Sequence, residues 1–116
     1  MTYKPHSQIY QVYNAGVVEF YTKTVMKDRF NTPIRGQYSK DLVLRDWFRK
    51  LGITSEDTYY ASADDKKLTR KIAIRGDIDV DVKWFASIDG KEYEIYRYYY
   101  AYKKSETEIS LVEVAE

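Results

Sequence analysis

The fold of this chain is decided around residues 84–95, which read Trp-Phe-Ala-Ser-Ile-Asp-Gly-Lys-Glu-Tyr-Glu-Ile. Asp-Gly is a preferred sequence for the tight type I′ turn that joins two antiparallel strands. Apolar and polar residues alternate on both sides of Asp89-Gly90, as they do in strands with one buried face. The segment therefore predicts a β-hairpin whose second strand runs from Lys91 to about Tyr102.

The same alternation continues before and after this hairpin. Residues 68–75 and 78–86 each gather apolar side chains on one face, and residues 108–114 are rich in Ile, Leu and Val. A further strand is expected from Gly16 to about Met26, where β-branched and aromatic residues are frequent. These strands predict a mainly β (α+β) fold, a small antiparallel β-barrel or sandwich-like sheet.

One flanking helix is predicted at about residues 40–51. Ser39 can cap its N-terminus, and Gly52 stands where a left-handed C-terminal cap is expected. Four apolar residues recur at helical spacing: Leu44, Trp47, Phe48 and Leu51. We expect this apolar stripe to pack on the sheet, because a helix of about three turns is marginal alone.

Two long loops are predicted on either side of this helix. Residues 27–38 contain Asn31, Pro33 and Gly36 and show no periodicity, which indicates a loop. Residues 53–67 contain two turn-like acidic stretches, so we also expect a loop there, with at most a short strand at its paired tyrosines. The first of these loops carries three basic residues: Lys27, Arg29 and Arg35.

Composition limits the classes of function that are open to the chain. Its 116 residues fit a single domain at 1–116, in which we expect residues 1–13 to form a flexible N-terminal arm. Nineteen Lys and Arg against eighteen Asp and Glu give a net charge of +1, so bulk charge predicts neither a nucleic-acid nor a membrane partner. No segment approaches the roughly 18 apolar residues of a membrane helix, and no signal peptide is evident.

The residues that catalysis and metal binding usually require are scarce. The chain has no cysteine and a single histidine, His6, so we expect neither a common zinc site nor a Ser-His or Cys-His nucleophilic pair. Asp77, Asp79 and Asp81 form a D-x-D-x-D run that lacks the glycine and distant glutamate of a calcium loop. We interpret this run as the solvent face of a strand. The sequence thus predicts no enzyme, no cofactor and no metal.

Tyrosine is the most distinctive residue of the chain, with thirteen in total and six within residues 93–102. The four that would share one face of a regular strand are Tyr96, Tyr98, Tyr100 and Tyr102. Large amphipathic side chains are enriched in protein interfaces, so this row is our candidate protein–protein interface. Two alternatives stay open: a purely structural role, or stacking platforms for single-stranded nucleic acid. The basic residues that would assist stacking are Arg70, Lys71 and Arg75.

The order of these parts resembles the head–tail connector proteins of long-tailed bacteriophages and prophages, the head-closure and adaptor proteins. The resemblance is carried by the strand at 68–75 (Leu-Thr-Arg-Lys-Ile-Ala-Ile-Arg), the Asp-Ile-Asp that follows it, residues 82–95 with their D-G-K-x-Y-E-I segment, and the closing strand at 108–114. The opening Tyr3-Lys4-Pro5 and residues 16–20 are similar to members from phages of low-GC Gram-positive hosts.

The resemblance implies a subunit of the virion neck that is made in the bacterial cytoplasm and located at the head–tail junction. It would join the portal and head to the tail as part of a ring, for which the resemblance suggests twelvefold symmetry, and would help to retain packaged DNA. The implied partners are portal or adaptor proteins, tail proteins, other copies of the chain and, non-specifically, DNA; no membrane is implied. Lys27, Arg29 and Arg35 become candidates for a basic surface that faces the channel or the DNA.

Two other functions remain as alternatives to a head-closure or adaptor protein. One is a tail terminator or another neck or tail protein of the same virion. The other is a single-stranded nucleic-acid-binding β-barrel domain that uses its tyrosines as a stacking surface.

Overall fold

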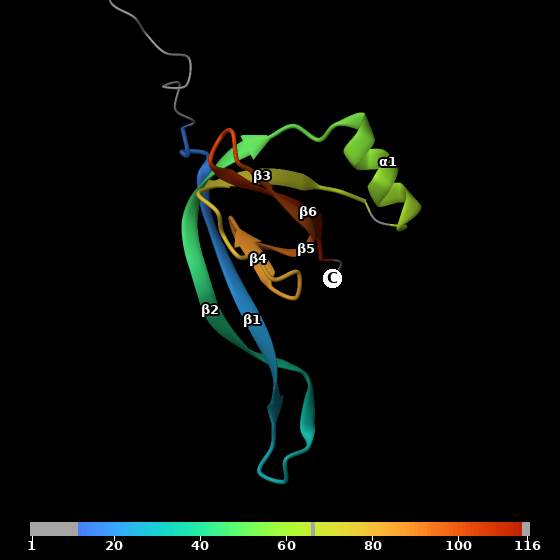
Figure 1. Ribbon diagram of the computed structural model, residues 1–116. Helices are drawn as coiled ribbons and strands as arrows, with labels where there is room; N and C mark the ends of the chain where they lie inside the picture. Colours follow the sequence, from blue (N-terminus) through green and yellow to red (C-terminus); the bar gives the residue numbers. More distant parts are fainter. Residues whose placement is uncertain (1–11, 66, 115–116) are drawn as a thin grey trace, which may run out of the picture.

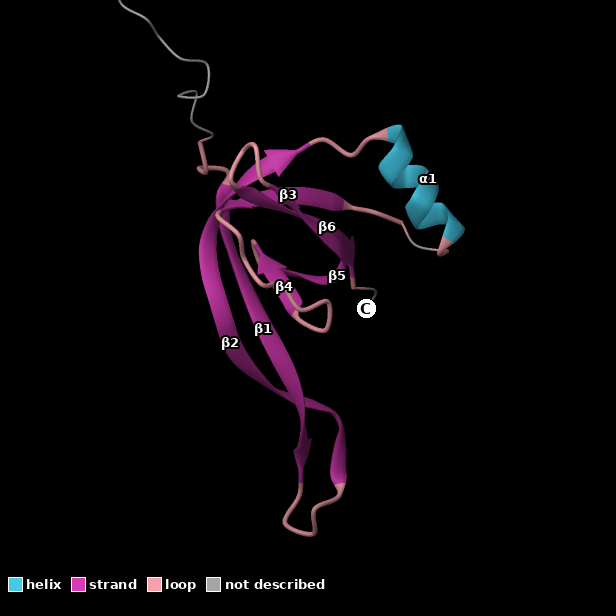
Figure 2. Ribbon diagram, in the orientation of Figure 1, coloured by secondary structure: helices cyan, strands magenta, loops and turns pink. Residues whose placement is uncertain are grey.

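The computed structural model describes residues 12–65 and 67–114. These residues form six antiparallel strands and one short helix (Figures 1 and 2). In chain order the elements are β1 (Gly16–Lys27), β2 (Pro33–Leu51), α1 (Ser55–Ala63), β3 (Arg70–Arg75), β4 (Phe85–Ile88), β5 (Lys91–Ala101) and β6 (Glu106–Glu113). The mainly β prediction is confirmed. No helix in the described part is long and apolar enough to cross a membrane.

The strands close into a barrel in the order β1-β2-β3-β6-β5-β4. Closure occurs where β1 pairs with β4 and Phe20 lies opposite Ala86, so the two edges of the sheet satisfy each other's backbone groups. The barrel encloses one apolar core, to which every strand and the loop before β4 contribute. Its buried members are Val18, Phe20, Phe48, Ile72, Ile74, Val80, Ala86, Ile88, Tyr93, Ile95, Ile109 and Leu111.

The hairpin predicted at Asp89-Gly90 is confirmed. Both residues have positive φ, 52° and 79°, as a type I′ turn requires, and Ile88 lies directly opposite Lys91. The strands expected on either side of it are present as well, although β4 is shorter than predicted. Residues 77–84 are an unpaired loop in which Val80 is buried and Ile78 and Trp84 pack against the core. At residues 78–84 the alternation thus reflects burial of Ile78, Val80 and Trp84 without strand pairing, whereas Val82 is exposed.

The helix predicted at about residues 40–51 is wrong. These residues form the second half of β2, which pairs first with β1 and then with β3. Leu44 and Phe48 do share a buried side, because a spacing of four residues fits one face of a strand as well as one face of a helix. The position of Trp47 distinguishes a strand from a helix. A helix would place its side chain on the same face as Phe48, whereas here Trp47 is 54% exposed. Pairing with two neighbouring strands outweighs a weak helical propensity.

The helix lies instead in the segment predicted as a loop at 53–67. Thr54 caps α1 through a reciprocal pair of hydrogen bonds with Asp57: the Asp57 amide donates to Thr54 Oγ1 at 3.1 Å, and the Thr54 amide donates to Asp57 Oδ2 at 3.0 Å. This capping box satisfies two amides that have no partner inside the helix. The helix stands outside the barrel wall (Figures 1 and 2), and its side-chain contacts with the barrel are to β3 and β5.

The loop predicted at 27–38 is mostly strand, because only residues 28–32 turn the chain between β1 and β2. Both strands continue past the barrel, and the pairing of Thr24 with Ser39 and of Val25 with Tyr38 lies beyond it. Residues 24–39, which we call the distal ribbon, lead away from the body of the molecule (Figure 1). At its tip the Asp28 carboxylate accepts hydrogen bonds from the Phe30 and Thr32 amides, at 2.8 and 3.0 Å.

The flexible arm predicted at 1–13 lies outside the described residues except for its last two positions, 12 and 13. His6 also lies outside them. Of the two described positions, Tyr13 contacts the barrel. Its hydroxyl donates to Glu106 Oε2 at 3.4 Å, and the Arg75 guanidinium lies 5.1 Å from its ring centre. Tyr13 is therefore packed against the barrel.

Candidate interaction surfaces

A β-bulge at Tyr96 divides the tyrosine-rich strand. Ile95 lies opposite Leu111 and Arg97 lies opposite Ser110, so Tyr96 is an extra residue without a partner on β6. A bulge reverses the alternation of every side chain that follows it. The sequence prediction that four tyrosines share one face is therefore wrong.

The four tyrosines occupy three different environments. Tyr98 lies opposite Ile109 and Tyr100 opposite Thr107, and opposite side chains in a ladder project to the same side, so both follow the inner side of the wall. Tyr98 is nevertheless 48% exposed, which leaves part of its ring accessible. Tyr96 projects to the outer side, and Tyr102 lies in the exposed turn between β5 and β6.

Tyr96 is bound within the molecule by the end of α1. Its hydroxyl donates to the Asp64 carboxylate and lies 3.2 Å from the Tyr60 carbonyl oxygen. The Asp64 hydrogen bond, followed by partial desolvation, raises the pKa of Tyr96. This tyrosine holds α1 against β5, which makes it a structural contact of the subunit.

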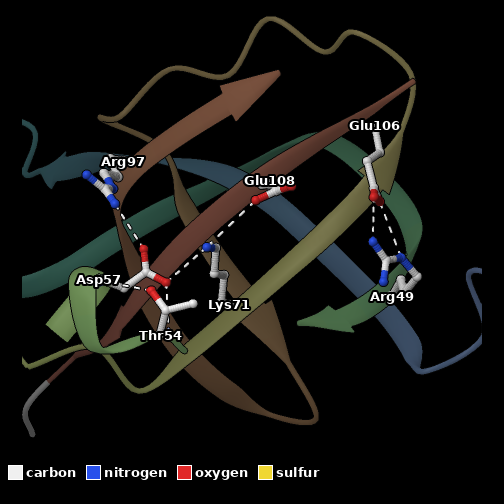
Figure 3. Close-up of polar contacts among 7 residues, drawn as sticks. All are labelled: Arg49, Thr54, Asp57, Lys71, Arg97, Glu106 and Glu108. Atoms are coloured by element: carbon white, nitrogen blue, oxygen red, sulfur yellow. Dashed lines mark hydrogen bonds and ion pairs between the residues drawn. The ribbon is translucent and has the colours of Figure 1, made fainter. Parts of the chain in front are cut away.

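An ionic network attaches the N-terminal turn of α1 to the barrel (Figure 3). Asp57 Oδ2 accepts from Lys71 Nζ at 3.0 Å and Asp57 Oδ1 accepts from Arg97 Nη2 at 2.9 Å, while Lys71 Nζ also lies 3.7 Å from Glu108 Oε1. Burial alone would raise the pKa of Asp57, but the Thr54 amide and the Lys71 ammonium outweigh burial and hold its pKa well below the usual aspartate range. The network is fully paired.

The ion pairs of this network reduce the positive charge that is free to assist stacking of nucleic-acid bases. A hollow of about 300 Å³ beside β5 is lined by Lys71, Arg97, Tyr98, Tyr99, Glu108 and Ser110. Its two cations are the same Lys71 and Arg97 that bind Asp57. Of the three basic residues that the sequence suggested for stacking, Lys71 is thus engaged, and Arg70 and Arg75 lie over the rings of Phe48 and Tyr13.

A second buried ion pair lies at the opposite end of β3 (Figure 3). The Arg49 guanidinium donates from Nε to Glu106 Oε2 at 3.3 Å and from Nη2 to Glu106 Oε1. The Glu106 side chain is completely buried, so this fork supplies the hydrogen bonds that its charge requires. The Tyr13 hydroxyl donates a further hydrogen bond to the same Glu106 carboxylate.

A third cluster fixes the root of the distal ribbon to the barrel. Glu92 of β5 accepts from Lys23 Nζ at 2.6 Å and from the Tyr21 hydroxyl, and Lys40 Nζ lies 3.9 Å away. Burial would raise the pKa of Glu92, but the hydrogen bonds from Lys23 and Tyr21 lower it. Burial and the Glu92 carboxylate together raise the pKa of Tyr21. Strands β1, β2 and β5 are thereby joined where the ribbon leaves the wall.

The three basic residues proposed from the sequence all lie on the distal ribbon. Lys27 ends β1, Arg29 lies in the turn and Arg35 lies in β2, and all three side chains are exposed. Phe30 stands among them and is 73% exposed, with the Arg29 guanidinium 4.8 Å from its ring centre. The structure thus places all three basic residues on one projecting ribbon rather than in a loop, and Arg29 contacts an exposed aromatic ring there.

The D-x-D-x-D run borders a second hollow that the sequence did not predict. The hollow, of about 410 Å³, is lined by Asp79, Val80, Asp81, Val82 and Tyr98. Asp77, Asp79 and Asp81 are exposed, although they lie in the unpaired loop rather than along a strand as interpreted from the sequence. Among the described residues no group of three or more His, Cys, Asp or Glu is placed to hold a metal ion.

Neither models of known protein families nor curated proteins give a match to this chain.

Proposed function

We propose that this chain is a structural protein of the bacteriophage virion neck, a ring subunit that joins the portal and head to the tail and helps to retain packaged DNA. The observation that carries the proposal is the distal ribbon. It projects from a closed barrel and exposes Val25, Met26, Phe30 and Tyr38 to solvent. Exposed apolar side chains that gather on a projecting element are typical of a surface that a partner covers.

The energetics of the ribbon support the same proposal. A two-stranded hairpin without a core is marginally stable in water, and residues 24–39 include no buried side chain. In an assembly the neighbouring subunits would cover the ribbon and supply the missing burial. Portal or adaptor proteins, tail proteins and other copies of the chain are the partners in this proposal.

The charge distribution suits a subunit that lies close to DNA without reading its sequence. Lys27, Arg29 and Arg35 are exposed along the projecting ribbon and its turn rather than packed in a base-sized pocket, so they would meet phosphates. The proposed role includes no catalysis. The buried carboxylates of Asp57 and Glu106 are engaged in ion pairs that stabilise the subunit.

A single-stranded nucleic-acid-binding domain is the second candidate. Exposed rings of Tyr98, Tyr99 and Tyr102 on a small closed barrel favour it, because bases stack on such rings. The engagement of Lys71 and Arg97 by Asp57 weighs against it, because stacking platforms usually act beside free cations.

The test is to locate the chain in virus particles. Phage or induced prophage particles from the source are purified, analysed by mass spectrometry and labelled with immunogold against this protein. Label at the head–tail junction is expected, and label further along the tail would favour the tail-terminator alternative. Absence from particles, together with retention of the purified protein on single-stranded DNA that weakens with salt, would replace the proposal with the nucleic-acid function.

A further inference from the structure

Two surfaces of this chain are complementary in charge and in apolar character. The first is the ribbon tip, residues 27–35, where Phe30 is exposed beside Arg29. Three basic residues (Lys27, Arg29 and Arg35) against one acid (Asp28) give the tip a formal charge of 3 − 1 = +2. The Asp28 carboxylate is turned into its own loop, where it accepts two amide hydrogen bonds. The tip therefore presents an exposed aromatic ring, with Arg29 beside it, on a segment of net positive charge.

The second surface is the hollow of about 410 Å³ at residues 79–82 and Tyr98. Val80 is buried beneath it, and Val82 is 51% exposed at its side. Residues 77–83 contain three aspartates and one lysine, which give 1 − 3 = −2, opposite to the tip. The hollow therefore presents an apolar floor within an acidic rim.

The tip and the hollow of one molecule do not meet. The ribbon leads away from the barrel, and its tip lies well apart from the loop that precedes β4 (Figure 1). The β1–β2 ladder and the Glu92 cluster at its root hold it in that direction. An occupant of the hollow would then come from outside the molecule, and the surface of this protein that complements it is the ribbon tip of a second copy.

We propose that the ribbon tip of one copy docks in the acidic hollow of the next, with Phe30 against Val82 and Tyr98 and with Arg29 and Arg35 facing Asp79 and Asp81. The proposal rests on the neck function above and names the two faces through which the ring would form. Because the two faces differ, the contact is head-to-tail, and it repeats from copy to copy until a ring closes. Opposite charges on the two faces favour this register over tip-to-tip contact.

Thiol pairing tests the contact directly, because the natural chain has no cysteine. A variant with Phe30→Cys and Val82→Cys is oxidised at high protein concentration, and a ladder of disulfide-linked oligomers is expected. Each single-cysteine variant can only reach a dimer. A matched control combines Phe30→Cys with Tyr59→Cys, a position on α1 that lies outside the hollow and is more exposed than Val82. Its ladder should form at least about tenfold more slowly, and equal rates for the two pairs would overturn the proposal.

Charge reversal tests the direction of the contact. A tip variant carries Arg29→Glu and Arg35→Glu, and a hollow variant carries Asp79→Lys and Asp81→Lys. Each variant alone should stay monomeric in sedimentation velocity at low salt, because its two faces then repel. An equimolar mixture should associate, because the reversed tip suits the reversed hollow and the natural tip suits the natural hollow. A mixture that stays monomeric while the natural chain associates would contradict the proposal.

The outcomes separate this inference from the neck function. If the protein forms a disulfide ladder but is absent from virus particles, the docking contact is supported and the neck function is refuted. If instead the natural chain is found at the head–tail junction but stays monomeric up to millimolar concentration, and the Phe30→Cys, Val82→Cys variant gives no ladder, only the docking contact is refuted.

Discussion

Arg97 of β5 donates a hydrogen bond of 2.9 Å to Asp57 at the start of α1, and the bulge one residue earlier makes this contact possible. In a regular strand Arg97 would project to the same side as Ile95, into the apolar core. The extra residue at Tyr96 turns the guanidinium outward to the helix. One irregularity in a strand thus decides where the only described helix can attach.

Removing the charge of Asp57 should loosen α1. Asp57→Asn keeps the shape of the capping side chain but loses the ion pairs with Lys71 and Arg97. We expect the free energy of unfolding to fall by about 1–2 kcal/mol, at the low end for charged hydrogen bonds because Arg97 is half exposed. Urea titration measures the change. Glu56→Gln, on an exposed position of the same turn, is the control and should change stability by less than about 0.5 kcal/mol.

Stability should decrease in acid. The folded-state pKa values of Asp57 and Glu92 are lowered, so their contribution is fully present above the unfolded-state pKa values of about 4. That contribution is lost as pH falls through the folded-state values, because the unfolded chain then binds the protons first. Urea midpoints measured from pH 7 down to pH 2 should fall below about pH 5. Asp57→Asn should flatten this decline, and an unchanged slope would contradict the role of Asp57.

Deleting Tyr96 should be tolerated. The deletion joins Ile95 directly to Arg97 and restores a regular ladder, in which Arg97 still lies opposite Ser110. Deleting Tyr99, which has a partner in the ladder, shifts later residues by one and reverses their direction. Thermal unfolding followed by circular dichroism should show a small decrease in Tm for the first variant and loss of a cooperative transition for the second. Similar losses in both would mean that the bulge is required for folding.

Truncating Arg49 should destabilise the barrel more than other charge changes on β2. Arg49→Ala leaves the fully buried Glu106 carboxylate without its main partner, which costs about 3 kcal/mol or more. Arg45→Ala, at an exposed position of the same strand, is the matched control and should be nearly neutral. In the double variant Arg49→Met with Glu106→Leu, much of the stability should return, because no buried charge remains. Denaturant unfolding of all four proteins measures these differences.

The parts of the fold that depend on local chemistry could be predicted from the sequence. Asp89-Gly90 specifies its own turn, and the strands around it alternate because one face is buried. The wrong helix at 40–51 shows the limit of periodicity, since Leu44 and Phe48 fit both structures and the deciding partners lie in β1 and β3. Helix α1 had a readable signal, the Thr54–Asp57 capping box, but it has no apolar stripe to confirm it.

The candidate surfaces were harder to predict because they depend on contacts between distant segments. The bulge at Tyr96 is defined by the register with β6. The sequence alone therefore could not show which tyrosines lie on the inner and which on the outer side of the strand. The basic residues Lys27, Arg29 and Arg35 lie on the same projecting segment, and their role toward a channel or DNA stays a prediction. Pro33 and Gly36 suggested a loop there, but an exposed ribbon tolerates both. Gly36 adopts a φ of 77° within β2, which only glycine takes without strain.

The continuity of β1 and β2 from the barrel wall into the distal ribbon has a mechanical consequence. A pull on the ribbon tip is directed along the two strands, so it acts lengthwise on the ladders that join β1 to β4 and β2 to β3. Hydrogen bonds loaded in this direction share the force and must break together, whereas bonds at the end of a peeling strand break one at a time. Force applied to the ribbon is therefore carried by the strand ladders of the barrel wall.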